Sequence, residues 1–155
     1  FCDDYVELVK NRAYGSLGED RAVPARAALR VALSVLLRLF APVLPFVTEE
    51  VWSWWHDEQS VHRAPWPGQS ELEGGAEPAL WEAARKVLGE VRRKKTEASV
   101  SLRAPVALVR ITAPEPDLDR LRAAADDLIQ AGNISDLRLM AAEPGEDAGV
   151  AAELA

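Results

Sequence analysis

The chain has 155 residues, of which 48% are hydrophobic and 28% charged, and a formal net charge of −7. This length suits one domain or two small ones. The acidic balance argues against general affinity for nucleic acids, DNA included, because phosphate binding depends on Lys and Arg replacing counterions. The single cysteine, Cys2, excludes an internal disulfide, and no stretch has the pattern of a signal peptide or the length of a membrane span. We therefore expect a cytoplasmic protein that does not bind membranes.

Residues 1–14 predict a helix, because apolar side chains recur at helical spacing from Cys2 to Ala13. No capping signal precedes them, so we expect the protein to continue upstream of Phe1. Residues 15–22 are expected to form a loop. A second helix is expected to have Pro24 in its first turn and to run to about Phe40.

This second predicted helix is apolar on nearly all sides. Its polar positions form one line at four-residue spacing, namely Arg26, Arg30, Ser34 and Arg38. So narrow a polar strip is typical of a helix inside a bundle, and the other helices of that bundle would lie upstream. We expect these arginines to pair with acidic residues of the first helix; RNA contact is the alternative.

A third helix is predicted to begin near Phe46, with Thr48, Glu49 and Glu50 in its first turn, where acids favour the helix dipole. Residues 56–77 contain Pro and Gly and are expected to be an irregular connection between two subdomains. We therefore predict a helical bundle over residues 1–57, with its N-terminal helices missing, and a linker over 58–77.

The second half of the chain alternates helix and strand patterns. Helices are predicted over 78–97 and 117–131, the latter closed by Gly132 and Asn133. Strands are predicted over 106–112 and 134–140. This α-β-α-β order indicates a small α/β subdomain over 78–141, with helices on one face of its sheet. Residues 142–155 are expected to be an acidic, flexible tail. The predicted fold class is thus mainly α, with a small α/β part.

No arrangement of residues predicts catalysis. His56 and His62 lie in the connecting segment without the convergent ligands that a metal site needs. No glycine-rich phosphate loop is present, and neither Ser34 nor Ser53 has a recognisable histidine partner. We expect no catalytic residue, no metal and no cofactor in this chain.

A basic strip on the helix over 78–97 is the best candidate for a binding site. Residues 78–104 hold seven basic and three acidic side chains, so this segment is positive within an acidic protein. Gly89 shares the helical face of the arginines, where its missing side chain would let a phosphate backbone approach. An ordinary solvated face is the alternative. The candidate RNA-binding residues, two of them from the first helix, are Arg85, Lys86, Arg92, Arg93, Lys94, Lys95, Lys10 and Arg12.

Aromatic side chains could stack on unpaired bases if they are exposed. The candidates are Tyr5, Tyr14, Trp54, Trp55 and Trp66. We favour the alternative, in which Trp52 and Trp55 pack the bundle and Trp66 holds the connecting segment.

Three segments resemble one family in their order and spacing. A helix of the anticodon-binding bundle of valyl-tRNA synthetases is similar to residues 1–15, FCDDYVELVKNRAYG. The Pro-Phe-x-Thr-Glu-Glu-x-Trp segment of the valyl, isoleucyl and leucyl enzymes resembles LRLFAPVLPFVTEEVWSWW, and the Ala-x-Trp-Pro that follows it matches SVHRAPWPG. The α/β subdomain after the bundle is similar to VLGEVRRKKTEASVSLRAPV and ISDLRLMAA. The resemblance covers residues 1–141, and its first segment favours the valyl enzymes over the isoleucyl ones.

The resemblance implies a tRNA-binding, anticodon-recognition domain of a class I valyl-tRNA synthetase. The parent enzyme would be an ATP-dependent valine–tRNA ligase of protein biosynthesis. The family's His-Ile-Gly-His and Lys-Met-Ser-Lys-Ser signatures are absent from this sequence, so the chain would not aminoacylate by itself. Two alternatives stay open, the equivalent domain of an isoleucyl enzyme and an acidic helical module that binds proteins. An incomplete bundle would also expose an apolar face through which the chain self-associates.

Overall fold

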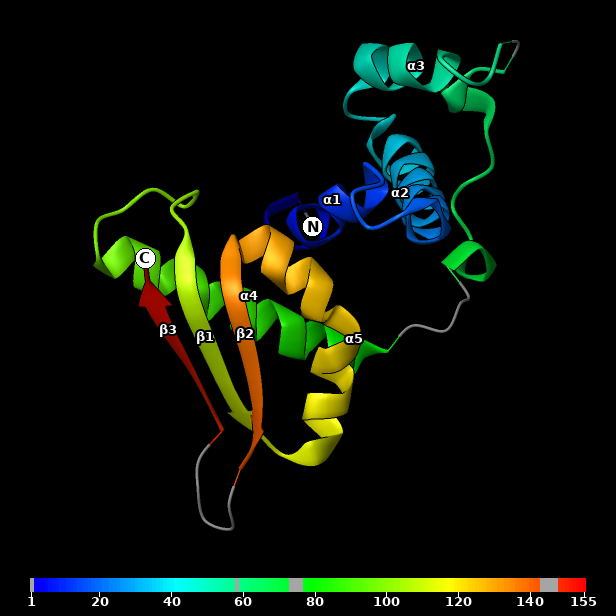
Figure 1. Cartoon of the computed structure of the whole chain (residues 1–155). Helices are drawn as coiled ribbons and strands as arrows, with labels where there is room; N and C mark the ends of the chain where they lie inside the picture. Colours follow the sequence, from blue (N-terminus) through cyan, green and yellow to red (C-terminus); the bar gives the residue numbers. More distant parts are fainter. Residues whose placement is uncertain (1, 58, 73–76, 143–147) are drawn as a thin grey trace. The chain divides into compact units, whose positions relative to one another are not determined.

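The computed structural model describes residues 2–57, 59–72, 77–142 and 148–155 (Figure 1). The chain groups into two compact units, an α/β unit of residues 1–21 and 77–155 and a helical unit of residues 22–76. Helices predominate and the strands form one small sheet, which confirms the predicted mainly α fold with a small α/β part. Among the described residues, no helix combines the length and apolarity needed to cross a membrane.

The described residues of the α/β unit form a three-stranded sheet of β1 (Val106–Ala113), β2 (Ile134–Ala141) and β3 (Gly149–Leu154). β1 lies in the middle, parallel to β2 and antiparallel to β3. Helix α5 (Glu115–Gly132) connects the parallel pair, as such a crossover requires. β3 lies in the segment predicted to be a flexible tail, and that prediction is wrong for residues 149–154. Its Ala and Glu residues have low strand propensity, so only pairing with β1 reveals the strand.

Helices α4 (Pro78–Glu97) and α5 cover one face of this sheet (Figure 1). Alternate residues of β1 are buried, as expected for a strand with one covered face: Val109, Ile111 and Ala113. The helices contribute Leu88, Val91, Leu118 and Leu128 to the same core, each at most 1% exposed. The predicted arrangement of this α/β part is therefore confirmed.

Gly132 and Asn133 have different roles at the end of α5. Asn133 adopts the left-handed conformation (φ 52°, ψ 53°) that stops the helix. Gly132 meets a packing requirement instead, because a Cβ atom there would lie 2.8 Å from the Ile134 side chain. The predicted helix stop is confirmed, with Asn133 supplying the left-handed residue.

The N-terminal helix belongs to the α/β unit, whereas the prediction placed it in a bundle over residues 1–57. It starts as a π-helical turn, η1 (Cys2–Val6), and continues as α1 (Glu7–Ala13), which packs against α5. An ion pair of 3.0 Å joins Arg92 of α4 to Asp4, the latter in η1. Asp4 and Arg92 lie far apart in the sequence, so the helical periodicity of either segment does not predict their contact.

Helix α2 (Glu19–Phe40) begins before the predicted loop over 15–22 has ended. The turn ahead of it uses Gly15 and Gly18, whose φ angles of 87° and 91° favour glycine. Acidic residues then occupy the first turn of the helix, where they favour its dipole. Pro24 consequently lies inside the helix, where its missing N–H removes one backbone hydrogen bond.

Helix α3 (Pro45–Ser53) starts at a proline, which suits the first helical position. The residues predicted for the first turn, Thr48, Glu49 and Glu50, lie beyond it. Glu49 instead accepts a hydrogen bond of 3.0 Å from the backbone N–H of Val61. Its carboxylate therefore holds the connecting segment against α3.

The helical unit has a small core of Leu37, Ala41, Trp52 and Val61. The Trp52 ring stacks on His56 with centroids 4.1 Å apart. Where the structure describes it, at residues 56–57, 59–72 and 77, the connecting segment after α3 is irregular as predicted, except for two short 3-10 turns. These are η2 (Val61–Arg63) and η3 (Gln69–Leu72).

Arg38 is buried in the helical unit. The prediction that it pairs with the acids of the first helix is wrong, because its partner is Glu71. Its guanidinium donates to both carboxylate oxygens of Glu71, with Nη1 at 3.0 Å from Oε1, and to the Pro65 carbonyl at 3.3 Å. The hydrogen bond from Arg38 is the main cause that lowers the pKa of Glu71 to about 2. This ion pair ties the connecting segment back to α2.

Candidate nucleic-acid interface

The outer face of α4 carries the predicted basic strip. The apolar residues of this amphipathic helix face the sheet and α5, so Arg85, Lys86 and Arg93 are exposed and Lys94 is half-buried. Gly89 lies among them with no heavy atom within 4 Å of the position of a Cβ atom. The middle of the strip is therefore open to an approaching ligand.

Acidic residues of α4 are interleaved with the basic ones. Arg93 pairs with Glu90 at 2.5 Å and with Glu97 at 2.7 Å, and Lys94 pairs with Glu97 at 3.1 Å. Glu90 is the main cause that raises the pKa of Arg93, while the hydrogen bond from Lys94 is the main cause that lowers the pKa of Glu97. These pairs reduce the positive field of the strip.

Breaking ion pairs of this kind costs little free energy. A pair three or four residues apart on a helix surface contributes only about 0.2–0.5 kcal/mol. A phosphate group that approaches the strip can therefore take over the arginine and lysine donors with little loss of helix stability.

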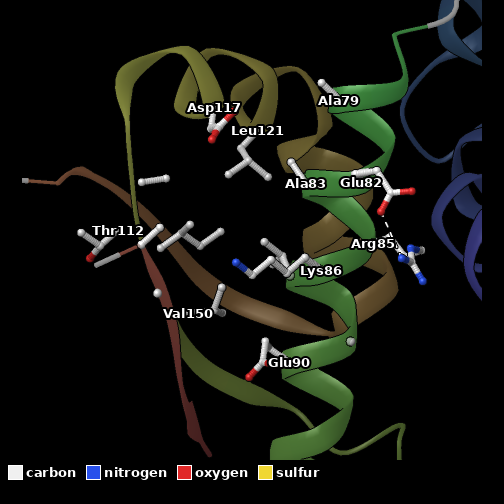
Figure 2. A pocket seen from close by; sticks show the side chains of 16 residues that line it. Ala79, Glu82, Ala83, Arg85, Lys86, Glu90, Thr112, Asp117, Leu121 and Val150 are labelled. Carbon is white, nitrogen blue, oxygen red and sulfur yellow. Dashed lines mark hydrogen bonds and ion pairs between the residues drawn. The ribbon is translucent and has the colours of Figure 1, made fainter. Parts of the chain in front are cut away.

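Lys86 has no ion pair among the described residues, and it lines a cavity of about 630 Å³ between α4 and the sheet. Figure 2 shows its ammonium group turned into this cavity, whereas Arg85 is turned away and pairs with Glu82 at 3.0 Å. Ile111 and Val150 contribute apolar walls. Lys86 thus offers an uncompensated positive charge next to the exposed strip.

Two of the predicted RNA-binding residues of α4 are held inside the α/β unit. Lys95 is 1% exposed, and its Nζ donates to the carbonyls of Gly132 at 2.7 Å and Leu102 at 2.9 Å. Burial, with a smaller contribution from Arg92, lowers the pKa of Lys95. The placement of Lys95 on an RNA-facing surface is therefore wrong. Arg92 is half-buried and donates to the Asp4 carboxylate at 3.0 Å.

The two candidates of the first helix are also engaged. Lys10 pairs with Glu7 on the same helix at 2.6 Å and stays partly exposed. Arg12 pairs with Asp127 of α5 at 3.0 Å. Burial raises the pKa of Asp127, and the charge of Arg12 opposes that shift. Arg12 thus stabilises the packing of α1 on α5, whereas Lys10 remains accessible.

The aromatic candidates divide into exposed and packed side chains. Tyr14, Trp54 and Trp66 are 82%, 67% and 65% exposed, so the expectation that Trp66 packs against the connecting segment is wrong. Trp52 is buried and Trp55 packs against the same small core, as expected. Tyr5 lies 5.9 Å from Trp81 between ring centroids. Only the exposed rings have a face available for base stacking.

The described residues contain no cluster of His, Cys, Asp or Glu that could hold a metal ion. What the α4 face offers is a row of exchangeable cationic donors, one uncompensated ammonium group and an open glycine. Such a surface binds and positions an anionic polymer through its phosphates. The interleaved acids Glu82, Glu90 and Glu97 could have been recognised in the sequence, because each lies three or four residues from a basic partner.

A family model described as the anticodon-binding domain of tRNA ligase matches residues 1–111. This match includes all of α4 and most of β1. The predicted resemblance to the anticodon-binding region of tRNA synthetases is therefore confirmed.

Three curated relatives of the chain are valine–tRNA ligases. The valine–tRNA ligase of Thermobifida fusca is 52% identical over 139 residues, which are 88% of this chain and 15% of that protein. The valine–tRNA ligase of Leifsonia xyli is 49% identical over 155 residues, with 97% and 17% covered, and that of Cutibacterium acnes is 46% identical over 142 residues, with 90% and 16% covered. The chain thus spans only a small part of the length of these relatives.

Proposed function

Since the chain belongs to the family of anticodon-binding domains of tRNA ligases, we propose that it binds valine tRNA as part of a valine–tRNA ligase. The match over residues 1–111 carries this proposal, and the similarity to the three valine–tRNA ligases named above supports the choice of valine. The equivalent domain of an isoleucine enzyme is the alternative that the experiment below distinguishes.

The exposed face of α4 is the proposed docking surface. From the cavity beside this face, Lys86 contributes an ammonium group that has no ion pair among the described residues, and Arg85, Arg93 and Lys94 exchange their helical ion pairs for tRNA phosphates. Lys10 is a secondary contact. Phosphate contacts fix the position and orientation of an RNA without reading its sequence, so this surface would position the tRNA.

The chemistry of aminoacylation is assigned to the rest of the proposed enzyme. ATP would activate valine there, since the His-Ile-Gly-His and Lys-Met-Ser-Lys-Ser signatures of the resembled family are absent from this sequence. The chain contributes binding and positioning of the tRNA, and the proposed setting is the cytoplasm, where protein biosynthesis takes place.

The test is the affinity of the chain for transcripts of valine tRNA and isoleucine tRNA, measured by fluorescence anisotropy over a series of KCl concentrations. We expect tighter binding of the valine tRNA and an affinity that falls steeply with salt. Tighter binding of the isoleucine tRNA would favour the isoleucine enzyme, and absence of binding to both would contradict the proposal.

A pair of double variants tests the α4 surface itself. Lys86→Ala with Arg93→Ala should reduce the slope of log K against log salt by about 1.5, since each lost phosphate contact accounts for roughly 0.7–0.9. Arg120→Ala with Arg122→Ala removes the same charge from ion-paired arginines of α5 and should leave the slope nearly unchanged. Equal slopes for the two double variants would contradict the assignment to α4.

A second function, self-association, is favoured by the helical unit. Large apolar side chains are exposed around the turn between α2 and α3, with Val43 75% and Phe46 90% exposed. Exposed apolar clusters of this kind mark interaction surfaces. The proposed partner is a second copy of the chain, which would bury the same side chains.

Sedimentation velocity tests this second function. We expect a concentration-dependent dimer that persists at high salt, because apolar contacts are not screened. Val43→Ser with Phe46→Ser should shift the chain to monomer without unfolding it, since both side chains are exposed. A monomer at every concentration of the unmodified chain would contradict self-association.

A further inference from the structure

A second, larger groove lies in the α/β unit, apart from the cavity beside Lys86. Its volume is about 1,030 Å³, and it is lined by the N-terminal helix, the C-terminal half of α4, the loop that follows α4 and the end of α5. It shares no lining residue with the cavity of Figure 2. Segments that lie far apart in the unit's sequence therefore build one site.

Most charged groups of this groove are already occupied. Lys10 pairs with Glu7, Arg92 binds the N-terminal turn, and the Lys95 ammonium is buried against two carbonyls. Leu102, which is 57% exposed, and the half-buried Val6 contribute accessible apolar surface. The groove is thus not a general anion site, and its specificity depends on the polar groups that have no partner.

Those polar groups are amides and one guanidinium. Asn11 and Gln130 line the groove, and within the described part of the chain no hydrogen bond engages either side-chain amide. Arg103, in the loop after α4, is exposed and has no ion pair among the described residues; Asp3 adds a carboxylate acceptor. Donors and acceptors therefore line one groove together with apolar surface.

This combination matches an unpaired nucleotide. A side-chain amide presents a donor and an acceptor side by side, which pair with the edge of a base. Unpaired bases of RNA loops are recognised in this way, because their edges are free and their faces pack on apolar or aromatic groups. A single accessible guanidinium suffices for one phosphate.

We propose that this groove holds one unpaired nucleotide of the tRNA, with its base edge on Asn11 and Gln130 and its phosphate near Arg103. The proposal rests on tRNA binding by this chain and adds a site that reads sequence to the α4 surface that positions the RNA. The α4 contacts are electrostatic, whereas the two amides carry no charge, so the two sites have separable signatures.

The test compares the affinity of the chain for valine tRNA with that for the same tRNA carrying replaced anticodon-loop bases. Asn11→Leu with Gln130→Leu should reduce the preference for the natural loop by roughly tenfold or more, and the salt dependence should stay unchanged. Both side chains lack hydrogen bonds to the described residues, so the variant is expected to fold, which circular dichroism checks. Gln69→Leu, an exposed position in the helical unit, is the matched control.

The sole cysteine gives an independent measurement, because Cys2 is exposed and lines this groove. Saturating tRNA should slow its reaction with an aromatic disulfide reagent by roughly tenfold. An unchanged rate under saturation, together with an unchanged preference of the Asn11 and Gln130 double variant, would overturn the groove assignment and leave tRNA binding intact. If the unmodified chain binds no tRNA, the proposed function fails and this inference fails with it.

Discussion

The surfaces that the two units of this chain expose to solvent differ in chemical character. Among the large apolar side chains that are exposed in the described residues, four lie in the α/β unit: Tyr14, Val100, Leu102 and Met140. The other twelve lie in the helical unit, although it is the shorter of the two. The α/β unit exposes paired charges instead. A charged surface suits phosphates and an apolar one suits another apolar surface, so each unit is fitted to a different partner.

The two units also differ in how each binds the cation buried among its described residues. Lys95 of the α/β unit is surrounded by neutral carbonyl acceptors, whereas Arg38 of the helical unit binds a carboxylate. The α/β unit uses its cation to join the end of α4 to the end of α5. The helical unit uses its cation to hold a connecting segment that has little regular structure. Variants at these positions test the comparison directly.

The largest effect is expected from Lys95→Ala. The carbonyls of Leu102 and Gly132 would lose a buried donor, which costs about 3 kcal/mol of the free energy of unfolding at 1–3 kcal/mol for each unsatisfied group. Urea denaturation measures this loss. The neighbouring Lys94→Ala removes a partly exposed ion pair and should change the stability by less than about 0.5 kcal/mol. Equal losses in the two variants would show that Lys95 is not an internal link.

Lys95 also shows where prediction from sequence ends. In the sequence it is one of four consecutive basic residues, Arg92 to Lys95, and only its spacing of four and seven residues from Val91 and Leu88 places it on the apolar face of the helix. Its acceptor on Gly132 lies 37 positions away, and the partner of Arg92 lies 88 positions away. Because a helical wheel describes only one helix, it cannot identify contacts that depend on how α1, α4 and α5 pack.

Local patterns were sufficient where the structure itself is local. The periodicity of α4 predicts both ends of that helix, and the β-branched run at Val106 predicts β1. β3 was missed because its alternation of Val150, Ala152 and Leu154 is weak and its stability comes from pairing with β1. The groove lined by Asn11 and Gln130 left no sequence signal either, since its residues come from four separate segments.

A smaller effect is expected from Gly89→Ala, which separates the stability of α4 from its binding surface. A Cβ atom there meets no heavy atom within 4 Å, so the variant should be more stable by about 0.5–1 kcal/mol. If a phosphate backbone approaches this position, tRNA affinity should fall while stability rises. Calorimetry and fluorescence anisotropy measure the two quantities. Gly68→Ala adds the same methyl group in the helical unit and should leave tRNA affinity unchanged. If Gly89→Ala also left tRNA affinity unchanged, Gly89 would not belong to the interface.

The smallest effect is expected from the pH dependence of the Arg38–Glu71 pair, because Glu71 is partly exposed and screened by solvent. Its pKa is lowered from 4.5 to about 2, so the folded state favours the ionised carboxylate. The resulting stabilisation is complete above pH 4.5 and is lost progressively as the pH falls from 4.5 to about 2.

In thermal unfolding between pH 7 and pH 2, Glu71→Gln should therefore show a lower midpoint than the unmodified chain at neutral pH, with the difference closing below pH 4.5. Glu82→Gln, which removes an exposed carboxylate from the α/β unit, is the matched control. If the difference for Glu71→Gln were the same at pH 7 and at pH 2, the buried cation of the helical unit would not depend on its carboxylate partner, and the contrast with Lys95 would fail.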